Sequence, residues 1–164
     1  MQADFLTGFL SLCKEAGLHT AIDTSGHAEW KDFSKVLPFT DIFLYDIKHL
    51  DPGEHKKLTG ADNKLILENL QKLSENRKAV EIRMPVIPGH NDSDEIILKT
   101  AEFLKEIETL TLVRVLQYHA LSGSKYASIG KTHTMPDPSG NEHRAVQRVS
   151  DILKSKGLPC KGPD

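Results

Sequence analysis

D-I-F-L-Y-D-I-K-H-L, residues 41–50, is the stretch that decides the fold. Its first half is an apolar run of strand-favouring residues, as expected for a strand buried on both faces of a parallel sheet. Asp46 and Lys48 then follow two residues apart, which places both side chains on one face at the carboxyl end of the strand. Because α/β proteins bind ligands at that end, the pair is interpreted as a ligand-binding element. A salt bridge at the rim of the sheet is the open alternative.

Composition limits the classes of function. The chain has 164 residues, which predicts one domain over 1–164, too short for a complete α/β barrel. A formal charge of −2 provides no basic field, so nucleic acid is not an expected partner. No run of about 20 apolar residues and no signal peptide occurs, so no membrane partner and a cytoplasmic location are expected. Cys13 and Cys160 are too far apart in sequence to indicate a cysteine metal cage.

Helical and strand patterns alternate along the chain. The spacing predicts a leading helix over residues 4–16, and then strands at 18–23, 42–47, 80–87 and 112–118, each followed by a helix. This order predicts an α/β fold with a parallel sheet. The residues Asn91 to Glu95 are read as a capping sequence for the helix at 93–107, and residues 158–164 as a loose tail. Because an α/β chain usually opens with a strand, the leading helix suggests that a preceding part is missing.

Polar residues end all four predicted strands. If the strands are parallel, these endings gather on one rim, where an α/β site is built. They suit a small zwitterionic or anionic ligand: Lys48 and Arg83 for a carboxylate, Asp46 or His119 for hydroxyls, Asp23 and Asp46 for a cation. The endings are Asp23-Thr24-Ser25-Gly26, Asp46 with Lys48, Arg83 before Pro85, and Tyr118-His119.

Structural roles remain open for three of these residues. Arg83 could extend from its strand to solvent, and His119 could cap the sheet as a neutral hydrogen-bonded ring. Asp23 could be the cap of the following helix. The sequence contains no nucleotide-phosphate loop and no G-x-S-x-G motif, which argues against phosphate binding through a glycine-rich loop and against a serine nucleophile.

Five motifs in register carry a family resemblance. Together they resemble the radical S-adenosylmethionine activating enzymes of glycyl radical enzymes over about residues 5–156. They are G-L-H-T-A-I-D-T-S-G (17–26), L-Y-D-I-K (44–48), L-T-G (58–60), I-R-M-P-V-I-P-G (82–89), and Q-Y-H (117–119) with G-x-K-Y-x-x-x-G (123–130).

The resemblance implies a fold. The chain would be the carboxyl-terminal parallel-sheet (βα)4 portion of the family's (βα)6 open barrel, a partial TIM barrel, and would start on a helix. The family's C-x-x-x-C-x-x-C loop, which holds a 4Fe-4S cluster, and its G-G-E-P motif do not occur in this sequence. Without cluster ligands we expect this chain alone to be catalytically silent. The strand at 18–23 would be an unpaired edge that favours self-association.

The resemblance also implies a cofactor and the residues that bind it. S-adenosylmethionine would place its carboxylate at Lys48, with the Ile47 backbone beside it. Asp46 and His119 would lie on the ribose or adenosine side. The strand from Arg83 to Pro85 would pass the adenine, and Asp23, Asp46 and the Thr24 backbone would form a monovalent cation site.

The implied partner is a glycyl radical enzyme, of which pyruvate formate-lyase is the commonest. Two alternatives stay open from the residues. The chain could be a non-catalytic module that binds S-adenosylmethionine or the partner, or a self-sufficient α/β enzyme that uses Lys48 as a Schiff-base amine.

Overall fold

The computed structural model describes residues 2–118, 128, 130 and 140–162, which form an α/β fold. The described helices are α1 (Ala3–Glu15), α2 (Trp30–Val36), α3 (Pro52–Thr59), α4 (Lys64–Glu75), α5 (Asp94–Lys105) and α7 (Glu142–Ser155), with a 3₁₀ turn at Leu37–Phe39. The strands are β1 (Ala21–Thr24), β2 (Ile42–Asp46), β3 (Ala79–Val86), β4 (Leu110–Gln117) and β5 (Cys160–Lys161). None of the described helices has the length and apolar character needed to cross a membrane.

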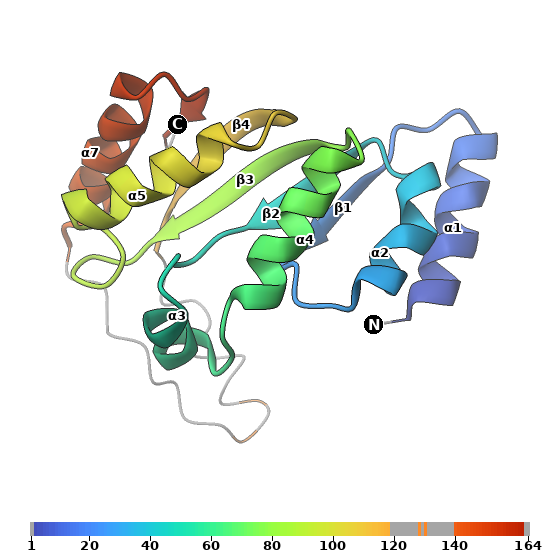
Figure 1. The fold of residues 1–164 in the computed structure, drawn as a ribbon, viewed down its shortest axis with the longest axis horizontal. Coiled ribbons are helices and arrows are strands. Elements are labelled where there is room, and N and C mark those ends of the chain that lie inside the picture. The colour runs from blue at the N-terminus through green and yellow to red at the C-terminus, as the bar shows by residue number, and fades with distance from the viewer. Residues whose placement is uncertain (1, 119–127, 129, 131–139, 163–164) are drawn as a thin grey trace.

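The strands form one sheet in the order β1-β2-β3-β4-β5, and all neighbouring pairs are parallel. Figure 1 shows α4 and α5 in front of the sheet, with α1 and α2 side by side at the β1 end and α7 at the other end. The short helix α3 lies apart from this layer. The four predicted strands and their parallel arrangement are therefore confirmed. Because all strands run in the same direction, their carboxyl ends lie along one edge of the sheet.

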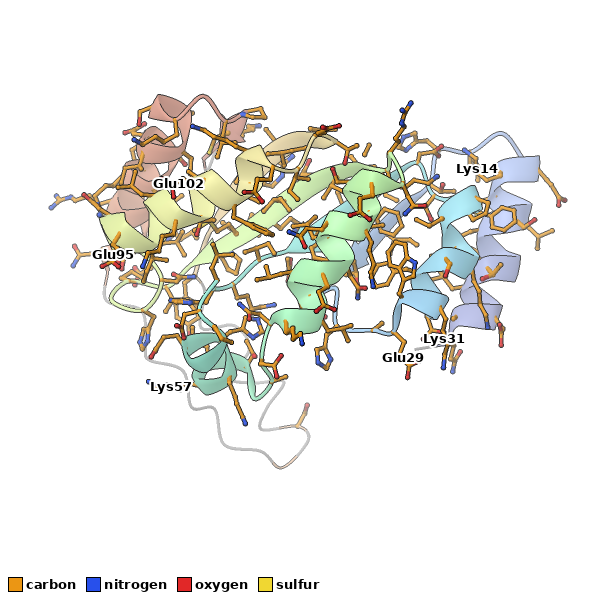
Figure 2. The ribbon with its side chains drawn as sticks, viewed as in Figure 1. Lys14, Glu29, Lys31, Lys57, Glu95 and Glu102 are labelled. Atoms are coloured by element: carbon orange, nitrogen blue, oxygen red, sulfur yellow. The ribbon has the colours of Figure 1, made fainter. Side chains whose placement is uncertain are left out.

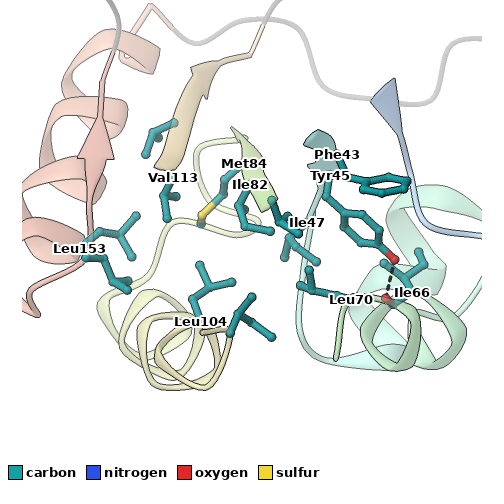
Figure 3. Packing of buried hydrophobic residues seen from close by; sticks show 14 of the residues in the cluster. Phe43, Tyr45, Ile47, Ile66, Leu70, Ile82, Met84, Leu104, Val113 and Leu153 are labelled. Carbon is teal, nitrogen blue, oxygen red and sulfur yellow. Dashed lines mark hydrogen bonds between the residues drawn. The ribbon is translucent and has the colours of Figure 1, made fainter. Parts of the chain in front are cut away.

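The core fills the space between the sheet and the helices. Phe43 and Tyr45 of β2 and Ile82 of β3 point toward Leu70 of α4 and Leu104 of α5, and all five side chains have no exposed surface (Figure 3). These residues alternate with partly exposed neighbours, because successive side chains of a strand point to opposite faces. Burial of this layer is the main stabilising contribution to the fold.

The second face of the sheet differs from the sequence prediction for β2. The apolar run predicts burial on both faces, but Ile42 and Leu44 are only half-buried, whereas Phe43 and Tyr45 are fully buried. In β3 the same half-buried positions carry Glu81, Arg83 and Pro85. Within the described residues, the sheet therefore has one apolar face under the helices and one face that carries charged side chains.

The chain end also differs from the prediction. Instead of a loose tail over residues 158–164, Leu158 is buried in the core, and Cys160–Lys161 pairs with β4 as β5. The Val113 N–H donates to the Pro159 carbonyl at 2.7 Å. Strand patterns need several alternating residues to be visible, so a two-residue strand beside a proline and a glycine leaves no sequence signal.

At the opposite end, β1 is an edge strand, as the sequence predicts. It lies beside α1, whose Phe5, Phe9 and Leu12 are more than half exposed. The rings of Phe5 and Phe9 stack with their centroids 6.4 Å apart. These side chains form an exposed apolar surface on α1.

Candidate functional site

Register brings the predicted site residues to one edge of the sheet. Asp46, the last residue of β2, is the partner of Arg83 in β3, and Asp23 in β1 is the partner of Leu44. Paired residues of a parallel sheet project to the same face. Asp23, Asp46 and Arg83 therefore share the charged face near the carboxyl ends of the strands, with Lys48 just beyond the end of β2.

Two ion pairs organise these side chains. Lys48 Nζ lies 3.1 Å from Asp46 Oδ2, and both side chains are about one-third exposed, at 33% and 27%. Arg83 forms an ion pair with Asp23, reaching across β2 to β1. Arg83 thus turns along the sheet rather than extending to solvent, and the Asp23 carboxylate accepts from a guanidinium rather than from a helix N-terminus.

Beside the Asp46–Lys48 pair lies a small cavity of about 150 Å³. It lies between the loop after β1, the end of β2 and the segment around α3. Its polar lining is supplied by Ser25, His27, Asp46, Lys48, His55 and Thr59. Larger hollows, of about 370 and 510 Å³, lie among Glu75, Glu106 and neighbouring residues and along α7, and neither gathers groups from the strand ends.

Backbone groups at the same edge are held in place. The Ile47 N–H extends the β2–β3 ladder by donating to the Arg83 carbonyl at 3.0 Å, while the Ile47 side chain is buried in the core. Thr24 Oγ1 accepts from the Gly26 N–H at 3.0 Å and so closes the turn after β1. The Pro85 carbonyl accepts from the Asn91 side chain at 2.7 Å.

Tyr45 supports this turn from below. Its hydroxyl donates to the Ile66 carbonyl at 2.7 Å, and its ring lies directly beneath Gly26, where an added Cβ would be 1.9 Å from the Tyr45 oxygen. Burial raises the pKa of Tyr45 well above its usual range, so the phenol stays neutral and keeps donating. The glycine of the D-T-S-G motif is therefore required by close packing.

Three buried asparagines were not predicted as part of the site. Each uses its side-chain amide to donate to two backbone carbonyls near the strand ends: Asn69 to Gly26 and Ala28, Asn63 to His49 and Leu50, Asn91 to Lys48 and Pro85. Their exposed fractions are 0–3%. Asn91 lies in the loop after β3, a position that could have indicated a role at the strand ends, whereas Asn69 lies within α4 and leaves no such sequence signal.

The predicted capping sequence over residues 91–95 contains the N-cap of α5. The N-cap of α5 is Ser93, whose hydroxyl accepts from the Ile96 N–H, whereas Asn91 is fully buried and bonds to the strand ends. Asn and Ser side chains can both bond to backbone groups, so residue type alone does not show which of the two caps the helix. The N-cap of α3 is Asp51, whose Oδ1 accepts from the Glu54 N–H at 2.8 Å.

The predicted site residues thus fall into three groups. The structure brings Asp46 together with Lys48, and Asp23 together with Arg83; Ile47, Thr24 and Pro85 contribute backbone groups nearby. His119 lies outside the described residues. Among the residues described, no group of three or more His, Cys, Asp or Glu side chains is arranged to hold a metal ion.

The chain resembles known proteins over nearly its whole length. A trans-4-hydroxy-L-proline dehydratase activating enzyme from Clostridioides difficile is 42% identical over 160 residues, which are 96% of this chain and 53% of the relative. A choline trimethylamine-lyase activating enzyme from Oleidesulfovibrio alaskensis is 33% identical over 97% of this chain and 52% of its own length. The chain is similar to the activating enzymes of glycyl radical enzymes.

Solved structures support the same relationship. A domain of pyruvate-formate lyase-activating enzyme from Bacteroides vulgatus superposes with a TM-score of 0.80 at 27% identity, covering 99% of this chain and 91% of that domain. The parallel sheet therefore matches the partial barrel of that activating-enzyme domain. The chain spans about half the length of the curated activating enzymes it matches. No protein-family profile matches the sequence.

Proposed function

We propose that this chain is the part of a glycyl-radical-enzyme activating enzyme that binds S-adenosylmethionine. The observation that carries the proposal is the gathering of Asp23, Asp46, Lys48 and Arg83 on one charged sheet face at the carboxyl ends of three neighbouring strands. Parallel strands are usually covered on both faces, so a charged, partly exposed face is suited to a polar ligand. The similarity to activating enzymes supports the same ligand.

The side chains suit the polar groups of S-adenosylmethionine. Lys48 would donate to the carboxylate of the methionine part, and Asp46 would accept from ribose hydroxyls. The strand from Arg83 to Pro85 would lie along the adenine, and the Ile47 backbone would lie between the two ends of the ligand. His119 would join the ribose side, as the family resemblance implies.

The ion pair between Lys48 and Asp46 does not oppose this binding. A partly exposed pair contributes only about 0–1 kcal/mol, because water already solvates both charges. A ligand carboxylate can therefore replace Asp46 as the partner of the Lys48 ammonium at a small cost in free energy. The Schiff-base alternative is disfavoured by the surroundings of Lys48, because such a lysine is usually desolvated in a hydrophobic pocket or lies beside another cation, whereas Lys48 is one-third exposed and lies beside a carboxylate.

A monovalent cation site at Asp23, Asp46 and the Thr24 backbone remains part of the proposal. Each carboxylate now pairs with a cationic side chain of the chain itself, so a bound cation would replace Arg83 at Asp23 or share Asp46 with Lys48. Carboxylate and carbonyl oxygens are the ligands that hard cations prefer. The test is whether potassium strengthens binding of S-adenosylmethionine.

The residues of this chain do not fit a 4Fe-4S cluster. Such clusters take cysteine thiolates, and the only two cysteines are Cys13 on α1 and Cys160 on β5, at opposite ends of the sheet. The proposal therefore assigns to this chain the binding and orientation of S-adenosylmethionine alone. The partner of the whole activating enzyme is proposed to be a glycyl radical enzyme such as pyruvate formate-lyase; the curated relatives are named for several different target enzymes.

Calorimetric titration of the purified chain with S-adenosylmethionine tests the proposal. We expect measurable binding, and we expect Lys48→Met to weaken it by about tenfold or more, since a hydrogen bond to a charged group contributes about 1.5–3 kcal/mol. Lys57→Met is the matched control, because Lys57 also pairs with a carboxylate, Glu54, but lies on α3 (Figure 2). No heat at millimolar ligand, or equal affinity in the two variants, would overturn the proposal.

A further inference from the structure

The loop after β3 folds a fully buried asparagine back against the strand ends. After Val86 the chain turns through Pro88 and Gly89, whose φ of +79° is in the left-handed region that favours glycine. The Asn91 N–H donates to the Ile87 carbonyl, which brings the Asn91 side chain beneath the ends of β2 and β3. Its exposed fraction is 0%.

The Asn91 carboxamide continues the sheet beyond its last backbone hydrogen bond. The β2–β3 ladder ends where the Ile47 N–H donates to the Arg83 carbonyl. One residue further, Asn91 Nδ2 donates to the Lys48 carbonyl at 2.9 Å and to the Pro85 carbonyl at 2.7 Å. The side chain thus joins two strand ends that no longer bond to each other directly.

The other end of the amide is also used. Asn91 Oδ1 accepts from the Ile87 N–H at 2.7 Å. Three hydrogen bonds therefore fix the side chain, and two of its donors and one acceptor are satisfied. Aspartate keeps the shape but lacks the donors, and alanine lacks every polar atom. Asparagine is the side chain of this length that satisfies all three backbone groups.

We propose that Asn91 is a positioning residue that holds the Lys48 backbone so that its ammonium can meet the carboxylate of S-adenosylmethionine. The inference rests on the proposed function and names a residue that acts on the ligand only through Lys48. A binding group has to be held to within about 0.5 Å by locked neighbours to contribute its full interaction. Lys48 lies past the end of β2, where no strand pairing restrains it, so the clamp from Asn91 replaces that restraint.

The other two buried asparagines do not bond to the Lys48 backbone. Asn69 joins carbonyls within the loop after β1, and Asn63 joins His49 to Leu50 within the loop after β2. Of the three, Asn91 is the one that bonds to the backbone of Lys48 and also reaches a second strand. Loss of Asn91 should therefore change the placement of Lys48 as well as the stability of the loop.

A double-mutant cycle on ligand affinity tests the inference. Asn91→Ala is expected to weaken binding of S-adenosylmethionine by about tenfold in the unmodified chain. In a Lys48→Met background the same change is expected to have little further effect, because the group that Asn91 positions is gone. Asn91→Ser serves as a milder second variant should the alanine variant fold poorly. Equal losses in both backgrounds would overturn the inference.

The control separates positioning from stability. Leu153→Ala truncates a fully buried core residue of α7 and should lower the urea midpoint of unfolding without changing the affinity of the folded molecules. If Leu153→Ala weakens binding as much as Asn91→Ala does, the effect of Asn91 is global and the inference falls.

Hydrogen exchange gives a readout that needs no ligand. Asn91→Ala should raise the exchange rates of amides at residues 47–51 more than those elsewhere in the sheet, and Leu153→Ala should not. If the unmodified chain does not bind S-adenosylmethionine, the proposed function fails while this measurement still decides on the clamp. Unchanged exchange at residues 47–51 would refute the clamp itself.

Discussion

Replacement of Gly26 by alanine should destabilise the chain strongly, because the turn after β1 rests on the buried ring of Tyr45. An added Cβ would lie 1.9 Å from the Tyr45 oxygen and 2.2 Å from Cζ, far inside contact distance. The ring cannot retreat easily, since it is fully buried and its hydroxyl donates to the Ile66 carbonyl. Gly26 also has a φ of +76°, which strains any residue with a Cβ.

The expected magnitude combines two effects. Left-handed backbone strain costs about 1–2 kcal/mol, and overpacking of a rigid core costs about 1–3 kcal/mol. Together they give a loss of roughly 2–5 kcal/mol from a total stability that is typically about 5–15 kcal/mol. Because the turn follows directly on Asp23 and Thr24, the same change should also disturb the Asp23–Arg83 ion pair.

Urea unfolding of two alanine variants measures the two effects separately. Gly17 has a φ of +72° and no atom within 4 Å of an added Cβ, so Gly17→Ala reports the strain alone. Gly26→Ala should cost clearly more than Gly17→Ala. In a Tyr45→Leu background, which removes the atoms that the Cβ meets, the cost of Gly26→Ala should fall to the Gly17 value. Equal costs at both glycines would refute the packing explanation.

Two further predictions concern the amino-terminal part of the molecule. The Lys14 ammonium and the Thr20 N–H hold the pKa of the Asp41 carboxyl well below its usual range. A lowered carboxyl pKa adds stability that is present above pH about 4 and is lost as pH falls. Urea unfolding should therefore show the unmodified chain more stable than Asp41→Asn, by a margin that shrinks below pH 4. A margin that does not change with pH would contradict this. Phe9→Lys breaks the exposed stack on α1 and should lower self-association in sedimentation velocity, whereas an unchanged distribution would exclude this surface as its cause.

Much of the fold could be predicted because its signals are local. Runs of strand-favouring residues located β2 and β3 to within a residue at each end. The polar endings could be predicted to converge because parallel strands share one carboxyl edge. β5 could not be predicted, since two residues are too few to show a period.

The long-range side-chain contacts within the site could not be predicted, because the residues that make them lie far apart in the sequence. Arg83 reaches Asp23 across an intervening strand, a contact that follows from the order of strands in the sheet. Asn91 has the local sequence of a helix cap, and only the turn at Gly89 directs its amide to the strand ends instead. Side-chain amides serve caps and buried clamps equally well, so tertiary structure decides between the two roles.

Backbone NMR of the ¹⁵N-labelled chain during titration with S-adenosylmethionine tests the central claim most directly. We expect the amide shifts to concentrate at the carboxyl ends of β1, β2 and β3, around Asp23, residues 46–48, Arg83 and Met84. Shifts confined to the groove along α7 or to the acidic hollow near Glu106, or none at saturating ligand, would contradict it.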